Sequence, residues 1–226
     1  MNYDVVSFDL DGTLVDTASE IAEAVNRALE LHGIARRPVP EITHLIGAGA
    51  HDLMRRLLAR CLAEQPTLYE RVQPVAVLAT LDEQYTVVTG SQAVPYAGCI
   101  EALERLRGAG LKLACVTNKE SKHARRVLEV TRIHAYFDLL VGGDTLPQKK
   151  PHASVLQHVA AVFGTSTARI VHVGDSATDV AAARNAGVAA WAVPYGYNAG
   201  LPIAESRPDR LVDSLRAVAE QVLQHT

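Results

Sequence analysis

Residues 3–17 read YDVVSFDLDGTLVDT, and this stretch contains the first strand of the expected fold. Its apolar run favours a β-strand buried on both faces, and Gly12 is a natural end for that strand. Side chains two positions apart in a strand share a face, so Asp9 and Asp11 point the same way. Two neighbouring carboxylates repel each other unless a cation lies between them or one keeps its proton. On this segment alone a capped Asp-Gly turn is the alternative, and other segments must decide.

The composition is that of an ordinary globular protein. The 226 residues are 48% hydrophobic and carry a net charge of −3, so there is no overall basic field for nucleic acid or for an anionic membrane. No apolar stretch approaches the roughly 20 residues of a membrane helix, and no secretory leader is visible. Three widely spaced cysteines form neither a disulfide framework nor a metal-ligand pattern. We therefore expect a cytoplasmic protein without a nucleic-acid or membrane partner.

Short apolar runs alternate with helical patterns over most of the chain. The expected strands are residues 4–9, 111–117, 137–141, 169–174 and 188–193, and the helices between the later strands are residues 99–109, 120–130, 152–163 and 177–186. This alternation predicts βαβ units and an α/β fold, a Rossmann-like doubly wound parallel sheet with helices on both faces.

The segment after the first strand has a different pattern. It shows helical patterns at about 18–32, 47–63 and 67–90 and no convincing buried strand. We therefore expect a helical cap domain over residues 16–92, inserted into a discontinuous core of residues 1–15 and 93–226. The chain would cross between core and cap at Asp16–Thr17 and at Thr89–Val94. If the first strand is central, the two crossings lie close together and the cap can swing as a hinged unit.

Polar side chains gather where the expected strands end. In an open α/β sheet, ligands bind outside the carboxyl ends of the strands. The residues placed there are Asp9, Asp11, Thr117, Asn118, Asp175 and Asp179, with Lys149 and Lys150 at a helix entry before the fourth strand. Each alone reads as a helix cap, a turn or a solvated lysine. Their convergence on one rim of one sheet predicts a functional site.

This set of side chains suits phosphate chemistry on a divalent cation. Carboxylate oxygens favour Mg²⁺, a lysine neutralises phosphoryl oxygens, and threonine and asparagine hydrogen-bond them. One carboxylate can attack phosphorus while a second acts as general acid and then as general base. The chain has no P-loop pattern, which excludes a Walker-type NTPase. The Gly47-Ala48-Gly49 segment lies in the helical block and lacks a third glycine, which argues against a dinucleotide fold.

Four motifs occur in order, FDLDGTLVDT at 8–17, VTNK at 116–119, KKPH at 149–152 and GDSATD at 174–179. Together they resemble the four motifs of the haloacid dehalogenase superfamily. Three further segments, LIGAGAHDLMRRLL, VGGD and PYGYNAG, look like those of bacterial phosphoglycolate phosphatases. Two departures, Ala97 and Ala153, stand where related sequences often carry proline, and we expect them to affect only loop entropy.

The resemblance implies a role for each acidic residue. Asp9 would be the nucleophile that becomes phosphorylated, and Asp11 would protonate the leaving alcohol and then activate water. Mg²⁺ would be held by a carboxylate oxygen of Asp9, the backbone carbonyl of Asp11, and Asp175. Asp179 would orient these ligands or a metal-bound water.

The resemblance also implies which residues hold the phosphoryl group. These are Thr117, Asn118 and Lys150, and we prefer Lys150 to Lys149 because it directly precedes the proline, as in the family motif. Lys149 is expected to face solvent. His172 lies within an expected strand and is predicted to be a packed residue rather than a ligand.

The cap narrows the choice of substrate. Residues 16–92 contain no lysine, which argues against a phosphonatase-type relative, because that chemistry needs a cap lysine for a Schiff base. Asp11 and Asp175 argue against a true dehalogenase, which needs no metal. Arg55 and Arg56 could bind the carboxylate of a small acid, although exposed arginines at helical spacing are usually solvated.

We therefore expect a phosphoric monoester hydrolase that acts on a small phosphorylated metabolite, with 2-phosphoglycolate, converted to glycolate, as the leading candidate. The alternatives are a phosphatase for a sugar phosphate, a nucleotide or pyrophosphate, a sugar phosphomutase, or a catalytically silent phosphate-binding module. The sequence leaves open whether the protein is a monomer or a homodimer.

Overall fold

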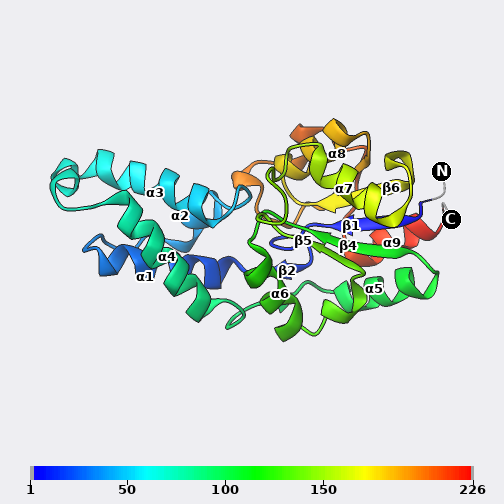
Figure 1. The fold of residues 1–226 in the computed structure, drawn as a ribbon, viewed down its shortest axis with the longest axis horizontal. Helices are drawn as coiled ribbons and strands as arrows, with labels where there is room; N and C mark the ends of the chain where they lie inside the picture. The colour runs from blue at the N-terminus through cyan, green and yellow to red at the C-terminus, as the bar shows by residue number, and fades with distance from the viewer. Residues whose placement is uncertain (1–2, 225–226) are drawn as a thin grey trace.

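A computed structural model describes residues 3–224 and has a six-stranded sheet as its central layer (Figure 1). The strands lie in the order β5-β4-β1-β6-β7-β8, and every neighbouring pair is parallel. Their bounds are β1 Val5–Phe8, β4 Lys112–Val116, β5 Leu139–Val141, β6 Ile170–Gly174, β7 Ala189–Ala192 and β8 Arg210–Leu211. The expected α/β fold is confirmed, and β8 is an additional edge strand that the sequence analysis does not predict.

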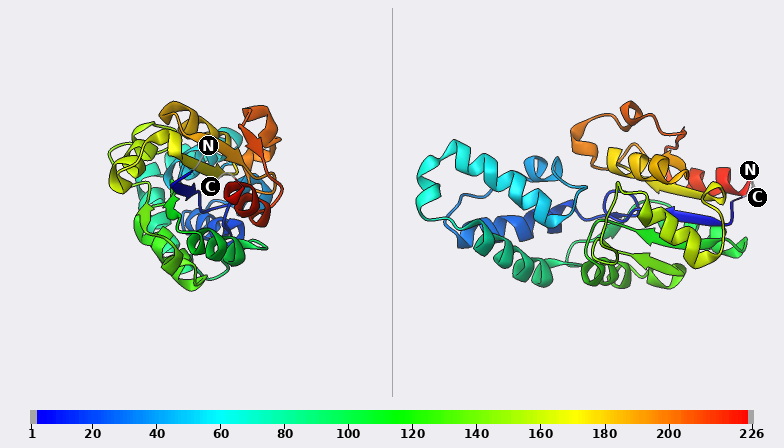
Figure 2. Two further views of the ribbon diagram at one scale, coloured as in Figure 1. Left: turned by 90° about the vertical axis from the view of Figure 1, so that its right-hand side faces the viewer. Right: turned by 45° about the horizontal axis from the view of Figure 1, so that its top comes forward.

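Helices cover both faces of the sheet (Figure 2). Their bounds are α5 Cys99–Gly108, α6 Ser121–Val130, α7 Ser154–Phe163, α8 Ala177–Ala186 and α9 Leu215–Leu223. Helices α5, α6 and α9 pack with one set of strand residues, which includes Val6 and Phe8. Helices α7 and α8 pack with the opposite set, which includes Val5. The first strand is thus buried on both faces, as its continuous apolar run predicts.

A helical unit lies between β2 (Val15–Asp16) and β3 (Val94–Pro95), which form a short antiparallel pair. Its helices are α1 Ala18–Leu31, α2 Val39–Thr43, α3 Ala50–Glu64 and α4 Pro74–Val88. Its buried apolar side chains form a hydrophobic cluster of their own, and Figure 1 shows the unit extending to the left of the sheet. From this separate cluster we infer that residues 16–92 form a cap on a core of residues 1–15 and 93–226. Residues 1, 2, 225 and 226 lie outside the described part of that core.

The cap differs from the expectation in two helices, since α2 (Val39–Thr43) lies where none was expected and another helix begins late. The helix expected over 67–90 begins only at Pro74, because the chain first makes a 3-10 turn over Pro66–Glu70. Proline is well suited to the first position of a helix, where no backbone N–H is needed. Other 3-10 turns lie at His134–Tyr136, Thr167–Arg169, Asn198–Gly200 and Ile203–Ser206. Within residues 3–224, no helix is both long and apolar enough to cross a membrane.

Candidate active site

The carboxyl ends of β1, β4 and β6 meet at one edge of the sheet, which faces the cap. Five of the predicted strand-end residues line one cavity there, together with Lys119 and Ser176: Asp9, Asp11, Thr117, Asn118 and Asp175. The cap contributes Ile21, Ile46, Gly47, Gly49, Ala50, Leu53 and Tyr85 to the same cavity. The structure therefore brings the predicted strand-end residues together, between the two parts of the chain.

Three buried carboxylates lie side by side at this edge. One oxygen of each of Asp9, Asp175 and Asp179 lies within 4.8 Å of the others. Burial, together with the neighbouring acids, raises the pKa of Asp9 to about 7 and holds that of Asp175 well above its usual range. A divalent cation would relieve this repulsion, so the residues present fit a metal site with hard oxygen ligands.

Lys150 supplies a buried positive charge beside these acids. Its Nζ atom lies 2.8 Å from Asp9 Oδ1 and 2.6 Å from Asp179 Oδ1, and it donates to the carbonyl of Val116 at 2.7 Å. Burial opposes the charged form, but Asp179 and Asp9 raise the pKa of Lys150 above its ordinary value. The lysine is therefore charged, and it forms ion pairs with both Asp9 and Asp179.

Asp179 is fixed by more contacts than any other of these acids. Burial opposes its charge, but Lys150 and His172 lower its pKa. His172 Nε2 lies 3.2 Å from Asp179 Oδ1, and the backbone N–H of Ser176 donates to Asp179 Oδ2 in the capping box of α8. Because its oxygens are already engaged, Asp179 is suited to orienting Lys150 rather than to holding an ion alone. The expected packing of His172 within a strand is also what the structure shows.

Asp175 is oriented by residues that the sequence analysis does not single out. Thr13 Oγ1 donates to Asp175 Oδ1 at 3.0 Å, and the backbone N–H of Tyr197 donates to Oδ2 at 2.6 Å. A β-carbon at Gly12 or at Gly196 would collide with the same carboxylate. Gly12 also has a φ of +87°, which disfavours other residues. The glycines therefore let two loops close around Asp175.

Thr117 and Asn118 face the cavity in different ways. Thr117 Oγ1 accepts a hydrogen bond from Lys119 N at 3.2 Å, which leaves its hydroxyl proton for another acceptor. The side-chain amide of Asn118 donates to the carbonyls of Gly47, at 2.9 Å, and of Lys150, at 3.0 Å. Asn118 thus links the cap to the core in this arrangement, and its NH₂ group is not free to donate to a phosphate.

Asp11 is held by Thr17 and Lys119, two residues of the quoted motifs to which the sequence analysis assigns no role in the site. Thr17 Oγ1 donates to Asp11 Oδ1 at 2.7 Å, and Lys119 Nζ lies 2.9 Å from Oδ1 and 3.1 Å from Oδ2. Lys119 directly follows Thr117 and Asn118 in the sequence. Its position just after a strand could therefore have indicated that it belongs to the site. The charge of Asp11 is therefore balanced by a lysine other than Lys150.

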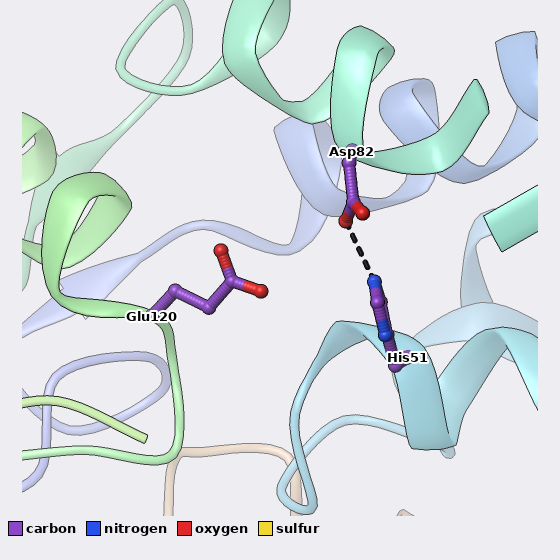
Figure 3. A group of neighbouring side chains, drawn as sticks. All are labelled: His51, Asp82 and Glu120. Carbon is purple, nitrogen blue, oxygen red and sulfur yellow. Dashed lines mark hydrogen bonds and ion pairs between the residues drawn. The ribbon is translucent and has the colours of Figure 1, made fainter. Parts of the chain in front are cut away.

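A second group of polar side chains lies at the adjoining cavity between cap and core. Figure 3 shows His51 of α3 and Asp82 of α4 hydrogen-bonded to each other, with the Glu120 carboxylate pointing toward them. The His51 Nε2–Asp82 Oδ1 distance is 2.6 Å, and the two side chains are about two-fifths exposed. Arg55 lines this cavity, whereas Arg56 is half-exposed and lies 3.6 Å from Asp52. The hydrogen bond of this group lies within the cap, and Glu120 is its one member from the core, with a carboxylate oxygen within 4.8 Å of atoms of the other two.

Replacing Lys150 with Met should lower the free energy of unfolding by about 3–5 kcal/mol at pH 7, because it leaves buried carboxylates without their cation. The depressed pKa of Asp179 contributes stability above the unfolded-state pKa of about 3.9, so the deficit should shrink as the pH falls below that value. Urea unfolding in EDTA, at pH 7 and at pH 3, measures both effects. Lys149→Met is the control, because Lys149 is exposed and should change stability by less than about 0.5 kcal/mol. An equal loss in the two variants would contradict the assignment.

Comparisons with known proteins agree with this geometry. Residues 6–193 match the family model described as haloacid dehalogenase-like hydrolase. The chain is 36% identical over 220 residues to a phosphoglycolate phosphatase of Thiobacillus denitrificans, covering 96% of this chain and 94% of that protein. A phosphoglycolate phosphatase of Nitrosospira multiformis is 39% identical over 212 residues, covering 93% and 91%. The crystal structure of a predicted phosphoglycolate phosphatase from Haemophilus somnus superposes with a TM-score of 0.92 at 30% identity, covering 98% of each chain.

Proposed function

The chain belongs to the haloacid dehalogenase-like hydrolase family and is a phosphatase, and on that premise we propose that it hydrolyses a small phosphomonoester through an aspartyl-phosphate with Mg²⁺ as cofactor. The leading substrate is 2-phosphoglycolate, the substrate named for its relatives. The observation that carries the proposal is the position of Asp9, which ends the central strand beside Lys150 and faces the cavity under the cap. We further propose that the protein acts in the cytoplasm, as a monomer or a homodimer.

The first half of the reaction uses Asp9 and Asp11. A carboxylate oxygen of Asp9 attacks phosphorus, and the bond from phosphorus to the ester oxygen breaks. Asp11 must enter this step in its protonated form, and it gives that proton to the ester oxygen, so the leaving group departs as an alcohol. Lys150 balances the charge of the phosphoryl oxygens, and Thr117 can donate its hydroxyl proton to one of them. The product is an acyl phosphate on Asp9.

The second half returns the protein to its starting state. Asp11, now a carboxylate, takes a proton from water, and the water oxygen attacks phosphorus. The bond between phosphorus and the Asp9 oxygen breaks, which releases inorganic phosphate. Asp179 keeps Lys150 in place through both steps, because the two form a fully buried ion pair at 2.6 Å.

The acidic residues account for the proposed cofactor. Asp9, Asp175 and the backbone carbonyl of Asp11 would hold the ion, and Asp179 would orient the site. When bound, Mg²⁺ supplies positive charge to the phosphoryl oxygens. Its first role for this chain is electrostatic, because it lets Asp9 stay ionised beside other buried carboxylates.

The cavity under the cap favours a small leaving group. Its free space is about 30 Å³, which is enough for about two water molecules. We propose that the cap opens to admit the ester and that apolar side chains such as Ile21, Ile46 and Leu53 then close over the leaving group. A larger ester would have to extend into the adjoining cavity beside His51.

A substrate panel tests this function. Phosphate release with Mg²⁺ would be measured for 2-phosphoglycolate, a sugar phosphate, a nucleoside monophosphate and pyrophosphate. We expect kcat/KM to be highest for 2-phosphoglycolate by roughly tenfold or more. If another ester is preferred, that ester replaces 2-phosphoglycolate as the proposed substrate, and the proposed mechanism stands. Release from none of them would indicate the silent phosphate-binding module instead.

A further inference from the structure

A line of buried polar contacts joins the cap to Asp11. Lys119 Nζ lies 2.9 and 3.1 Å from the two carboxylate oxygens of Asp11, and it donates to the hydroxyl of Tyr85 at 3.1 Å. Asp11 and Lys119 belong to the core, whereas Tyr85 belongs to α4 of the cap. We propose that Lys119 is a positioning residue for Asp11, and that Tyr85 holds Lys119 in place only while the cap covers the core. The proposal rests on the acid–base role of Asp11 in the function proposed above.

The contacts of Lys119 leave it little freedom. Its side chain is 3% exposed, and Tyr85 is 6% exposed. An ammonium group has three donors, and two oxygens of Asp11 and one of Tyr85 account for them. The same ammonium lies 5.1 Å from the centroid of the Tyr85 ring, within the range of a cation–π contact. Tyr85 therefore contacts Lys119 with both its hydroxyl and its ring.

The charges support the same arrangement. Burial opposes the charged form of Lys119, but Asp11 and Tyr85 raise its pKa above the ordinary value. Burial raises the pKa of Tyr85 to about 12, so its hydroxyl stays neutral and offers an oxygen to the ammonium. The lysine is thus a fixed cation that holds the Asp11 carboxylate from one side.

The position of Tyr85 links this contact to cap movement. Tyr85 lies in the last turn of α4, just before the chain crosses back to the core. Thr17, which donates to Asp11 at 2.7 Å, lies at the first crossing. Glu20 joins the two crossings by accepting from the backbone N–H groups of Gly90 and Gln92. A swing of the cap about these crossings would carry Tyr85 away from Lys119, so Asp11 is fully held only when the cap is closed.

Substrates with different leaving groups can show whether Lys119 acts through Asp11 or binds the substrate directly. A general acid accelerates the departure of an alkoxide strongly, whereas a nitrophenolate leaves without being protonated. If Lys119 acts through Asp11, its loss should impair hydrolysis of alkyl phosphates and spare that of p-nitrophenyl phosphate. Lys119 is also the one cation among the described residues that line the cavity. A direct bond from Lys119 to a carboxylate of the substrate is therefore the alternative that the test must exclude.

The experiment compares kcat/KM of the full chain with Mg²⁺ on three esters: 2-phosphoglycolate, the uncharged-tail ester 2-hydroxyethyl phosphate, and p-nitrophenyl phosphate. Lys119→Met should lower it roughly 10–100-fold on both alkyl esters and less than about 3-fold on the aryl ester. Tyr85→Phe should give the same pattern with a smaller loss, roughly 3–10-fold. Asp11→Asn sets the scale, with an expected loss of roughly 10²–10⁴-fold on the alkyl esters.

Lys149→Met is the matched control, because Lys149 also joins the core to the cap, through the carbonyl of Ala48, but does not contact Asp11. Any loss in that variant should be the same for alkyl and aryl esters. Equal losses on all three esters for Lys119→Met, with Tyr85→Phe unchanged, would overturn the proposal. So would a loss confined to 2-phosphoglycolate. If the wild-type chain fails to hydrolyse 2-phosphoglycolate, the proposed substrate is wrong, yet the comparison of alkyl with aryl esters still tests Lys119.

Discussion

Replacing Asp9 with Asn should lower phosphate release by roughly 10⁴-fold or more, the usual scale for loss of a nucleophile. The amide has nearly the same shape, so it keeps the packing at the end of β1, but it lacks the charge and the nucleophilic oxygen. Phosphate release gives the rate. Trapping phosphorylated protein in acid gives the intermediate, which should form in the wild type and be absent from Asp9→Asn.

The melting temperature of Asp9→Asn distinguishes a loss of catalysis from misfolding. Asp9 is one of three neighbouring buried acids, and its pKa of about 7 shows that the site disfavours its charge. Removing that charge should therefore leave the melting temperature unchanged or raise it. Asp4→Asn is the matched control, because Asp4 stands at the other end of the same strand in an exposed ion pair with Arg169. Full turnover by Asp9→Asn, or equal losses in the two variants, would reassign the nucleophile.

The sheet could be predicted because its strands are buried on both faces. Continuous apolar runs such as that of β1 have few other interpretations when helical patterns separate them. Strands β2, β3 and β8 are two residues long, too short to carry a pattern, and β8 is exposed as well. The sequence analysis makes no prediction for α9, although Leu215, Val218, Ala219 and Val222 recur at helical spacing and are buried.

The site could be predicted as far as it follows from strand ends. Asp9 and Asp175 directly follow strands whose carboxyl ends must meet, and Asp11 lies two residues after Asp9, so chain order alone brings the three together. The contact between Lys119 and Tyr85 depends instead on how the cap lies over the core, which no local pattern records. The same holds for the amide of Asn118, whose donors are used on backbone carbonyls rather than kept for phosphate.

The site contains more carboxylates than lysines to pair with them. Lys150 is paired with Asp9 and Asp179, and Lys119 with Asp11. Within residues 3–224, Asp175 accepts hydrogen bonds but forms no ion pair with a lysine or arginine. Burial and the neighbouring acids therefore hold the pKa of Asp175 well above its usual range. A divalent cation at this point would neutralise the charges of Asp9 and Asp175 together. Removing the cation should therefore weaken substrate binding and slow turnover.

Removing divalent metal should therefore abolish turnover, and added Mg²⁺ should restore it. Because the ion would bind only the folded chain, Mg²⁺ at 100 times its dissociation constant should also stabilise the protein by about 2.7 kcal/mol. Phosphate release after EDTA treatment measures the first effect, and thermal unfolding with and without Mg²⁺ measures the second without any need for activity. Asp175→Asn should lose both responses, whereas Asp4→Asn should keep them. Turnover that survives EDTA, or an equal Mg²⁺ response in Asp175→Asn, would show that these acids do not form the metal site. The repulsion between the carboxylates would then be relieved by something other than a metal ion.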